Sequence, residues 1–134
     1  MKEIKFNELY MSASKDGEMY FLELYIASGH MEYEVKVELE KIDFEILEKD
    51  AERAVFVHAA LHHPFQSGSS ALTKEKQREY LDIILHASKP EVEKFLTEKD
   101  HGSANGAVSN MVRITKQRDQ SIMRQGKWFI ENGR

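Results

Sequence analysis

Residues 31–40 alternate strictly between apolar and charged side chains, and this alternation constrains the fold more than any other feature of the sequence. In the stretch MEYEVKVELE the odd positions are apolar or aromatic and the even positions are charged. Because successive side chains of a β-strand point to opposite faces, the pattern predicts a half-buried strand. Its outer face is acidic, since it carries the carboxylates of Glu32, Glu34, Glu38 and Glu40.

Two upstream segments are candidates for strands of the same sheet. Residues 19–27 are rich in aromatic and branched side chains, and residues 3–11 show a weaker version of the same character. The connections between the candidate strands contain Asp16-Gly17 and Gly29, and such connections favour β-hairpins. The N-terminal third of the chain is therefore predicted to form a three-stranded antiparallel meander.

A change of phase follows Leu39, because the next apolar residues fall on the opposite parity. Either the strand carries a bulge and a helix begins at Asp50, or a helix begins near Asp43; both residues are good N-caps. In both cases residues 51–63 are predicted to be helical. That helix should end at His63-Pro64, since a residue before proline avoids helical geometry.

Three further helices are predicted from capping signals and apolar periodicity. The first covers residues 74–87 and follows the cap Thr73. The second is capped by Ser88 and has Pro90 and Glu91 in its first turn. The third covers residues 107–125 and stops at Gly126. Residues 127–131 are either a short closing strand or a tail packed on the core. The expected class is α+β, with the N-terminal meander packed against three or four C-terminal helices.

Length and composition favour one cytoplasmic domain. The chain has 134 residues, the size of a single domain, with residues 1–47 mainly in strands and residues 48–134 mainly in helices. It contains no cysteine, which excludes disulfides and thiolate sites. No signal-like N-terminus and no apolar run of about 20 residues is present, so we expect a cytoplasmic location and no membrane partner.

The charge is unevenly distributed and leads to the first functional hypothesis. Residues 1–52 carry a net charge of −8, whereas residues 101–134 carry +4. An acidic strand face can attract a basic macromolecular partner, although it can also serve only to keep the protein soluble and to discourage strand addition. In composition the chain is similar to small acidic inhibitors and immunity proteins. We expect a non-enzymatic binding protein that uses Glu32, Glu34, Glu38 and Glu40 and needs no cofactor.

A basic stripe on the last predicted helix supports a second hypothesis, a regulator that binds nucleic acid. The stripe includes Arg113, Lys116, Arg124 and Lys127, and its cations could contact phosphates. Trp128 and Phe129 could add base stacking. The negative net charge and the acidic strand oppose this hypothesis.

Two histidines one helical turn apart support a third hypothesis, a metal-dependent enzyme. His58 and His62 could offer two nitrogens to one divalent metal, with a third ligand supplied by the tertiary fold. The alternative is that both imidazoles pack at a helix C-terminus. The same helix is apolar nearly all round, and the residues Phe56, Val57 and Phe65 around it make a homodimer possible.

Overall fold

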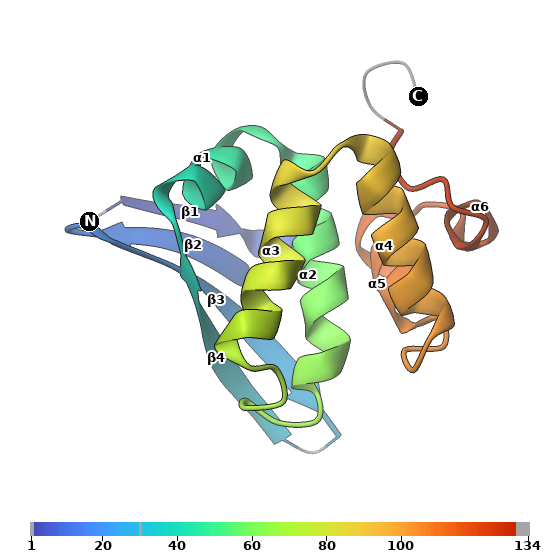
Figure 1. The fold of residues 1–134 in the computed structure, drawn as a ribbon. Helices are drawn as coiled ribbons and strands as arrows, with labels where there is room; N and C mark the ends of the chain where they lie inside the picture. The colour runs from blue at the N-terminus through green and yellow to red at the C-terminus, as the bar shows by residue number, and fades with distance from the viewer. Residues whose placement is uncertain (1, 30, 131–134) are drawn as a thin grey trace.

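The computed structural model describes residues 2–29 and 31–130 and has the α+β class expected from the sequence (Figure 1). Four strands pair in chain order as an antiparallel meander: β1 (Lys2–Phe6), β2 (Met11–Asp16), β3 (Met19–Ser28) and β4 (Met31–Leu39). The helices are α1 (Lys41–Lys49), α2 (Ala51–Phe65), α3 (Lys74–His86), α4 (Lys89–His101), α5 (Ala107–Lys116) and α6 (Gln120–Arg124). The sheet therefore has one strand more than predicted, and the helical part is more finely divided.

The extra strand arises because the predicted strand over residues 3–11 stops at Phe6, and residues 12–16, which were expected to belong to the connection, form most of β2. β1 ends at Phe6, and a single 3-10 turn, η1 (Asn7–Leu9), reverses the chain into β2. Tyr10 completes the reversal in the left-handed region with a φ of 51°, and its N–H donates to the Asn7 carbonyl over 3.2 Å. Residues other than glycine rarely adopt this geometry, and a tyrosine is not expected to do so. The sequence therefore gave no sign of a turn at this position.

The two glycine-containing connections are hairpin turns, as predicted. Asp16 pairs with Met19 across the first turn, and Gly17 has a φ of 64°. Gly29 has a φ of 61° in the second turn. Glycine is favoured at the first position of such tight turns because it tolerates positive φ without steric cost.

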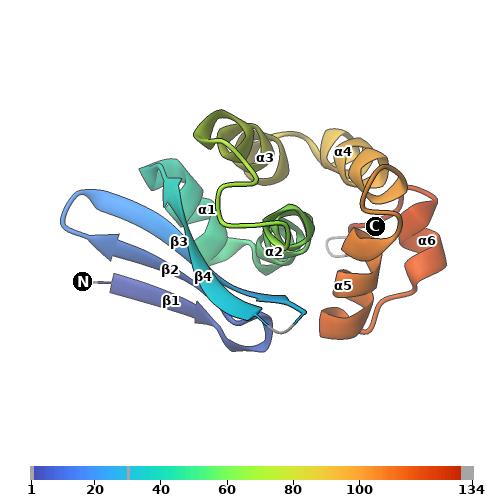
Figure 2. The ribbon, with the colours of Figure 1, turned by 90° about the horizontal axis from the view of Figure 1, so that it is seen from below.

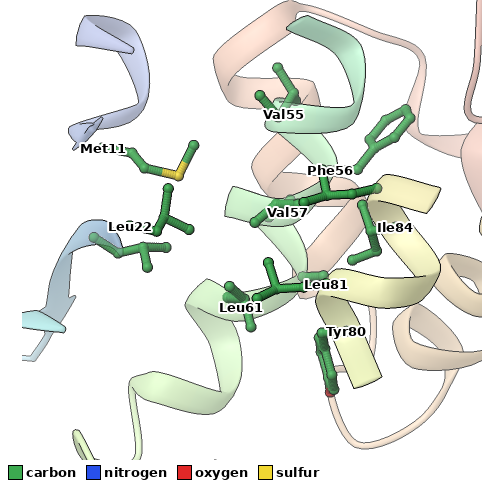
Figure 3. Close-up of a cluster of buried hydrophobic side chains, with 14 of the residues drawn as sticks. Met11, Leu22, Val55, Phe56, Val57, Leu61, Tyr80, Leu81 and Ile84 are labelled. Atoms are coloured by element: carbon green, nitrogen blue, oxygen red, sulfur yellow. The ribbon is translucent and has the colours of Figure 1, made fainter. Parts of the chain in front are cut away.

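One face of the sheet packs against helices and contributes Met11, Ala13, Leu22, Leu24, Ile26, Val35, Val37 and Leu39 to the core. Figure 2 shows α1, α2 and α3 on this side of the sheet, with α4, α5 and α6 beyond α2. The core close-up shows side chains from three layers meeting (Figure 3). They are Met11 and Leu22 from the sheet, Val55, Phe56, Val57 and Leu61 from α2, and Tyr80, Leu81 and Ile84 from α3.

Helix α2 lies between the sheet and the other helices, and every residue from Ala54 to Leu61 is buried. Phe56, Val57 and Phe65 are inside the core, so they offer no surface to a second copy of the chain. The helix also continues through Pro64 to Phe65, beyond the predicted end. Burial of Phe65 outweighs one missing hydrogen bond in the last turn, where the Gln66 N–H still reaches the carbonyls of the preceding residues.

The two candidate helix starts after the sheet mark two different helices. α1 begins at Lys41, so Asp43 lies inside its first turn rather than before it. Asp50 is the N-cap of α2, and its carboxylate accepts from the Arg53 N–H over 3.1 Å. The predicted helix over residues 107–125 is likewise divided, because Gln117 adopts a φ of 54° and ends α5. Thr73 and Ser88 cap α3 and α4 as predicted.

The described end of the chain is a tail packed on the core, held by two buried carboxylates. The N–H groups of Trp128 and Phe129 both donate to Glu93 Oε2, over 2.7 and 3.0 Å. The Ile130 N–H donates to Glu52 Oε2 over 2.8 Å. Within residues 2–29 and 31–130, no helix combines the length and the apolar character needed to cross a membrane.

Asp43 joins α1 to α3 through a buried ionic network. Its side chain is 0% exposed and accepts two hydrogen bonds of 2.7 Å from Arg78, one of 2.7 Å from His86 and one of 2.7 Å from the Glu40 N–H. Burial alone would raise the pKa of Asp43, but the hydrogen bonds from Arg78, from the Glu40 N–H and from His86 together hold it below its usual value. The ionised carboxylate therefore stabilises the fold at neutral pH.

Replacing Asp43 with Asn should lower the free energy of unfolding by about 3 kcal/mol at neutral pH, because Arg78 would lose its buried partner. The wild-type network is complete above the ordinary carboxyl pKa of about 4 and is lost as the pH falls through the lower folded-state value. Acid should therefore destabilise the wild type more steeply than the variant. Urea unfolding across this pH range measures both effects.

Asp82→Asn is the matched control, since Asp82 is exposed and contacts the same guanidinium over 2.8 Å. It should change the stability by less than about 1 kcal/mol. Equal losses from the two substitutions would contradict a special role for the buried carboxylate.

Candidate functional site

The face of the sheet opposite the helices is covered by no other element in the described part of the chain (Figure 2). The strand registers define which side chains point out from it, because pairing partners share a face. Its charged members are Glu3, Lys5, Asp16, Glu23, Glu32, Glu34, Lys36 and Glu38, and its aromatic members are Phe21 and Tyr25. We call this set the acidic face; it places six carboxylates beside two ammonium groups.

Three of the four glutamates predicted to bind a partner lie on the acidic face. Glu32 accepts a hydrogen bond of 2.7 Å from the Tyr25 hydroxyl, and this bond raises the pKa of Tyr25. Glu34 stands opposite Tyr25 in the strand register. Glu38 forms an ion pair of 3.0 Å with Lys74, and both of these side chains are largely exposed. Exposed ion pairs of this kind contribute little to the stability of the fold, so a binding partner can displace them.

Glu40 is in a different position from the other three glutamates. It lies just beyond the last residue of β4, at the N-terminus of α1. Its backbone N–H donates to Asp43 Oδ2 over 2.7 Å. The alternation from Glu32 to Glu40 could not distinguish the last position of a strand from the cap of the next helix, because both keep the same parity.

A hollow of about 630 Å³ lies on the acidic face next to the reversal between β1 and β2. Tyr10 and Tyr25 line it, with ring centroids 6.5 Å apart and planes tilted by 50°. Its other lining residues are Glu3, Lys5, Phe6, Asn7, Met11, Ser12, Glu23 and Glu34. Carboxylates beside exposed aromatic rings suit a cationic side chain, which can pair with the former and stack on the latter.

Sequence reasoning missed Tyr10 as a member of this hollow. The prediction placed it inside a continuous strand, whereas it stands at the left-handed turn and projects beside Tyr25. In the sequence, Tyr10 is simply an aromatic residue after Asn7-Glu8-Leu9, which fits a strand as well as a turn. Glu3 was missed because the sequence does not show which strand pairs with β1 or which of its side chains point outward.

The four basic residues proposed for nucleic-acid binding lie on two short helices and a tail rather than on one helix. Lys116 forms an ion pair of 2.9 Å with Glu8, which lowers the pKa of Glu8. Arg124 donates to His101 Nδ1 over 3.0 Å, and Arg113 donates to Asn110 within its own helix. Lys127 is exposed beyond α6.

The aromatic residues proposed for base stacking are not on the surface. Trp128 and Phe129 are buried, and both rings pack edge-on against Phe56. The Trp128 indole N–H donates to the Thr97 hydroxyl over 3.0 Å. Their role in this structure is to fasten the tail to α2 and α4, so the stacking component of that hypothesis is wrong.

His58 and His62 lie side by side, with ring centroids 5.6 Å apart. Burial, followed by the charge of His62, lowers the pKa of His58 to about 4, and burial followed by the charge of His63 lowers the pKa of His62. Both imidazoles are therefore neutral at pH 7, as metal ligands must be. His58 Nδ1 is buried and has no hydrogen-bond partner among the described residues.

A third metal ligand does not approach this pair within the described residues, among which no group of three His, Cys, Asp or Glu side chains has metal-binding geometry. Four other side chains that carry possible ligand atoms have contacts elsewhere. His86 and Asp82 belong to the network around Asp43 and Arg78, Glu79 pairs with Lys76, and His101 contacts Arg124. Metal binding at His58 and His62 stays a prediction that would need a ligand from outside the described chain.

Comparison of the chain with protein-family models, with curated proteins and with solved structures gives no match.

The neutral state of His58 can be tested by titration. Its ring resonances should titrate near pH 4 in the folded protein, below the ordinary value of about 6.5. Because the unfolded chain binds this proton more readily, stability should rise by about 3 kcal/mol as the pH increases from 4 to 6.5. His58→Phe should remove that slope, as measured by urea unfolding.

His63→Gln is the control, because His63 neighbours the pair but is only half-buried. It should leave the slope nearly unchanged. A His58 midpoint near 6.5 in the NMR titration would contradict the buried, neutral imidazole.

Proposed function

We propose that the protein is a non-enzymatic binding protein, inhibitor- or immunity-like, that recognises a basic partner protein through its acidic face. The observation that carries the proposal is a sheet face left uncovered by the described helices, with six carboxylates, two lysines and two aromatic rings. A cytoplasmic site of action is part of the proposal and agrees with a sequence that contains no cysteine.

The sheet holds these carboxylates in a rigid array. Alternate residues of one strand are about 7 Å apart, so Glu32 and Glu34 have a fixed spacing set by the backbone. A partner that binds such an array loses little conformational freedom on the side of this protein, which favours affinity. An excess of one charge also speeds association with a basic surface and makes it sensitive to salt.

The aromatic residues on the acidic face favour a basic protein over a simple counterion. Lys36 already lies over the Phe21 ring, with its ammonium 4.4 Å from the centroid. Tyr10 and Tyr25 present further rings beside the carboxylates of the hollow. An arginine from a partner can stack on such a ring and pair with a carboxylate at the same time.

A purely solubilising role is the alternative for the same charges. β4 is an edge strand of the sheet, and glutamates on an edge discourage the addition of another chain's strand. That role does not require the aromatic residues between the carboxylates, and it predicts that no partner is lost when the charges are reversed.

The two other functional hypotheses have less support. Among the cations proposed to bind nucleic acid, Lys116 and Arg124 already have partners within the protein. A metal-dependent enzyme would need a further ligand for His58 and His62. Both stay predictions, and neither is favoured by a specific contact.

Reversing two charges on the acidic face should strongly weaken partner binding. Wild-type protein and the double variant Glu34→Lys, Glu38→Lys are immobilised and exposed to lysate of the native cell, and retained proteins are identified by mass spectrometry. The wild type should retain a basic protein at low salt and release it at high salt. Calorimetry with that purified protein should show a loss of affinity of about 30-fold or more in the variant.

The control is Glu45→Lys, Glu98→Lys, which makes the same change in net charge at two exposed glutamates on helices. It should weaken binding only slightly, through the net charge. Equal weakening by the two double variants, or a retained partner that is acidic, would exclude the acidic face as the recognition surface.

A further inference from the structure

We propose that a second cavity, which is open to solvent and lined by residues of η1, β3, α2 and α5, binds a small neutral molecule that has an aromatic body and one hydrogen-bond donor. The cavity has a volume of about 440 Å³, within the range of small-molecule sites. It shares only Tyr10 and Tyr25 with the hollow on the acidic face. The inference is independent of the proposed function, and either can fail without the other.

The wall of this cavity is mostly apolar and carries no unpaired charge from the described residues. It is lined by Glu8, Leu9, Tyr10, Tyr25, Ala27, His58, His62, Gln66, Met111, Ile114 and Thr115. The only formally charged member at neutral pH is Glu8, whose carboxylate pairs with Lys116 over 2.9 Å. A charged ligand would lose its hydration without gaining a counterion here, so the site selects neutral molecules.

Large apolar side chains are exposed around the mouth of the cavity. Tyr10 is 74% exposed, Ile114 is 59% exposed and Tyr25 is 43% exposed. Exposed apolar groups that border a concave site are typical of ligand-binding surfaces. The two tyrosine rings, 6.5 Å apart and tilted, leave their edges and faces available to a third ring.

His58 supplies the polar group that fixes the orientation of the ligand. The residue is only 4% exposed and lines the cavity together with Leu9. Nδ1 has no partner among the described residues, and in the neutral tautomer that carries its proton on Nε2 the Nδ1 atom is an acceptor. An unpaired buried acceptor is destabilising, and an N–H or O–H of the ligand would satisfy it. Nδ1 is screened from solvent in this structure, so the proposal includes a turn of the imidazole ring toward the cavity when the ligand binds.

Indole and 1-methylindole form a matched pair of probes, because they have the same aromatic body and only indole has an N–H donor. Each is titrated into the isotopically labelled protein while amide resonances are recorded by NMR. Amides of Leu9, Ala27, Met111 and Ile114 should shift with both probes. Indole should bind about fivefold more tightly than 1-methylindole, the ratio expected for one neutral hydrogen bond.

Two variants separate the hydrogen bond from the cavity. His58→Phe keeps a ring in the wall but removes the acceptor, so the preference for indole should disappear. Ala27→Leu fills part of the cavity from an exposed position and should lower the affinity for both probes at least tenfold. Ile122→Ser, at an exposed residue of α6 outside the cavity, should leave both affinities unchanged.

Three results would overturn the proposal. The first is an absence of shifts at these amides with indole at about 5 mM, a concentration at which a site of this size should be occupied. The second is equal affinity of the wild type for the two probes, and the third is a preference for indole that persists in His58→Phe, which would show that the preference is steric. Since Ala27 is exposed, the Ala27→Leu variant tests the site even if His58→Phe lowers the stability of the fold.

Discussion

Burial of helix α2 is the constraint on which the rest of the structure depends. From Ala54 to Leu61 the helix has no solvent-exposed side, so apolar partners must surround it. The meander covers one side, and α3, α4 and α5 cover the others (Figure 2). Because the sheet has only one apolar face to contribute, its other face is left to solvent. The acidic face is therefore a direct consequence of how α2 is buried.

Buried carboxylates hold the outer helices and the tail in place around this core. Asp43 fixes α1 against α3, whereas Glu52 and Glu93 bind backbone N–H groups of the last described residues. Each of these groups is satisfied by strong donors, as a buried carboxylate must be. Two buried side-chain atoms of the described residues have no hydrogen-bond partner: Asp100 Oδ2, which lies 3.8 Å from Arg124 Nε, and His58 Nδ1. The ligand proposed for the neighbouring cavity would supply a hydrogen bond to His58 Nδ1.

The sequence predicted those parts of the structure that depend on local patterns. Strict alternation identified β4, glycines marked both hairpin turns, and Thr73, Ser88 and Asp50 marked helix starts. It did not predict the left-handed residues Tyr10 and Gln117, because their geometry is imposed by tertiary packing and not by residue type. Those two turns created the extra strand and divided the basic stripe. The hollow beside Tyr10 and the burial of Trp128 depend on contacts distant in sequence, which no local pattern reports.

Recognition of basic groups by the acidic face is the central claim, and NMR mapping with a hexa-arginine peptide tests it most directly. The account predicts that amide shifts concentrate on residues 21–25 and 32–38, that they saturate, and that added salt suppresses them. Exposed acidic residues on helices, such as Glu45, Glu75 and Glu98, serve as the internal comparison within the same spectra. Shifts spread evenly over the acids of the sheet and the helices, or stronger shifts on the helices, would contradict the account.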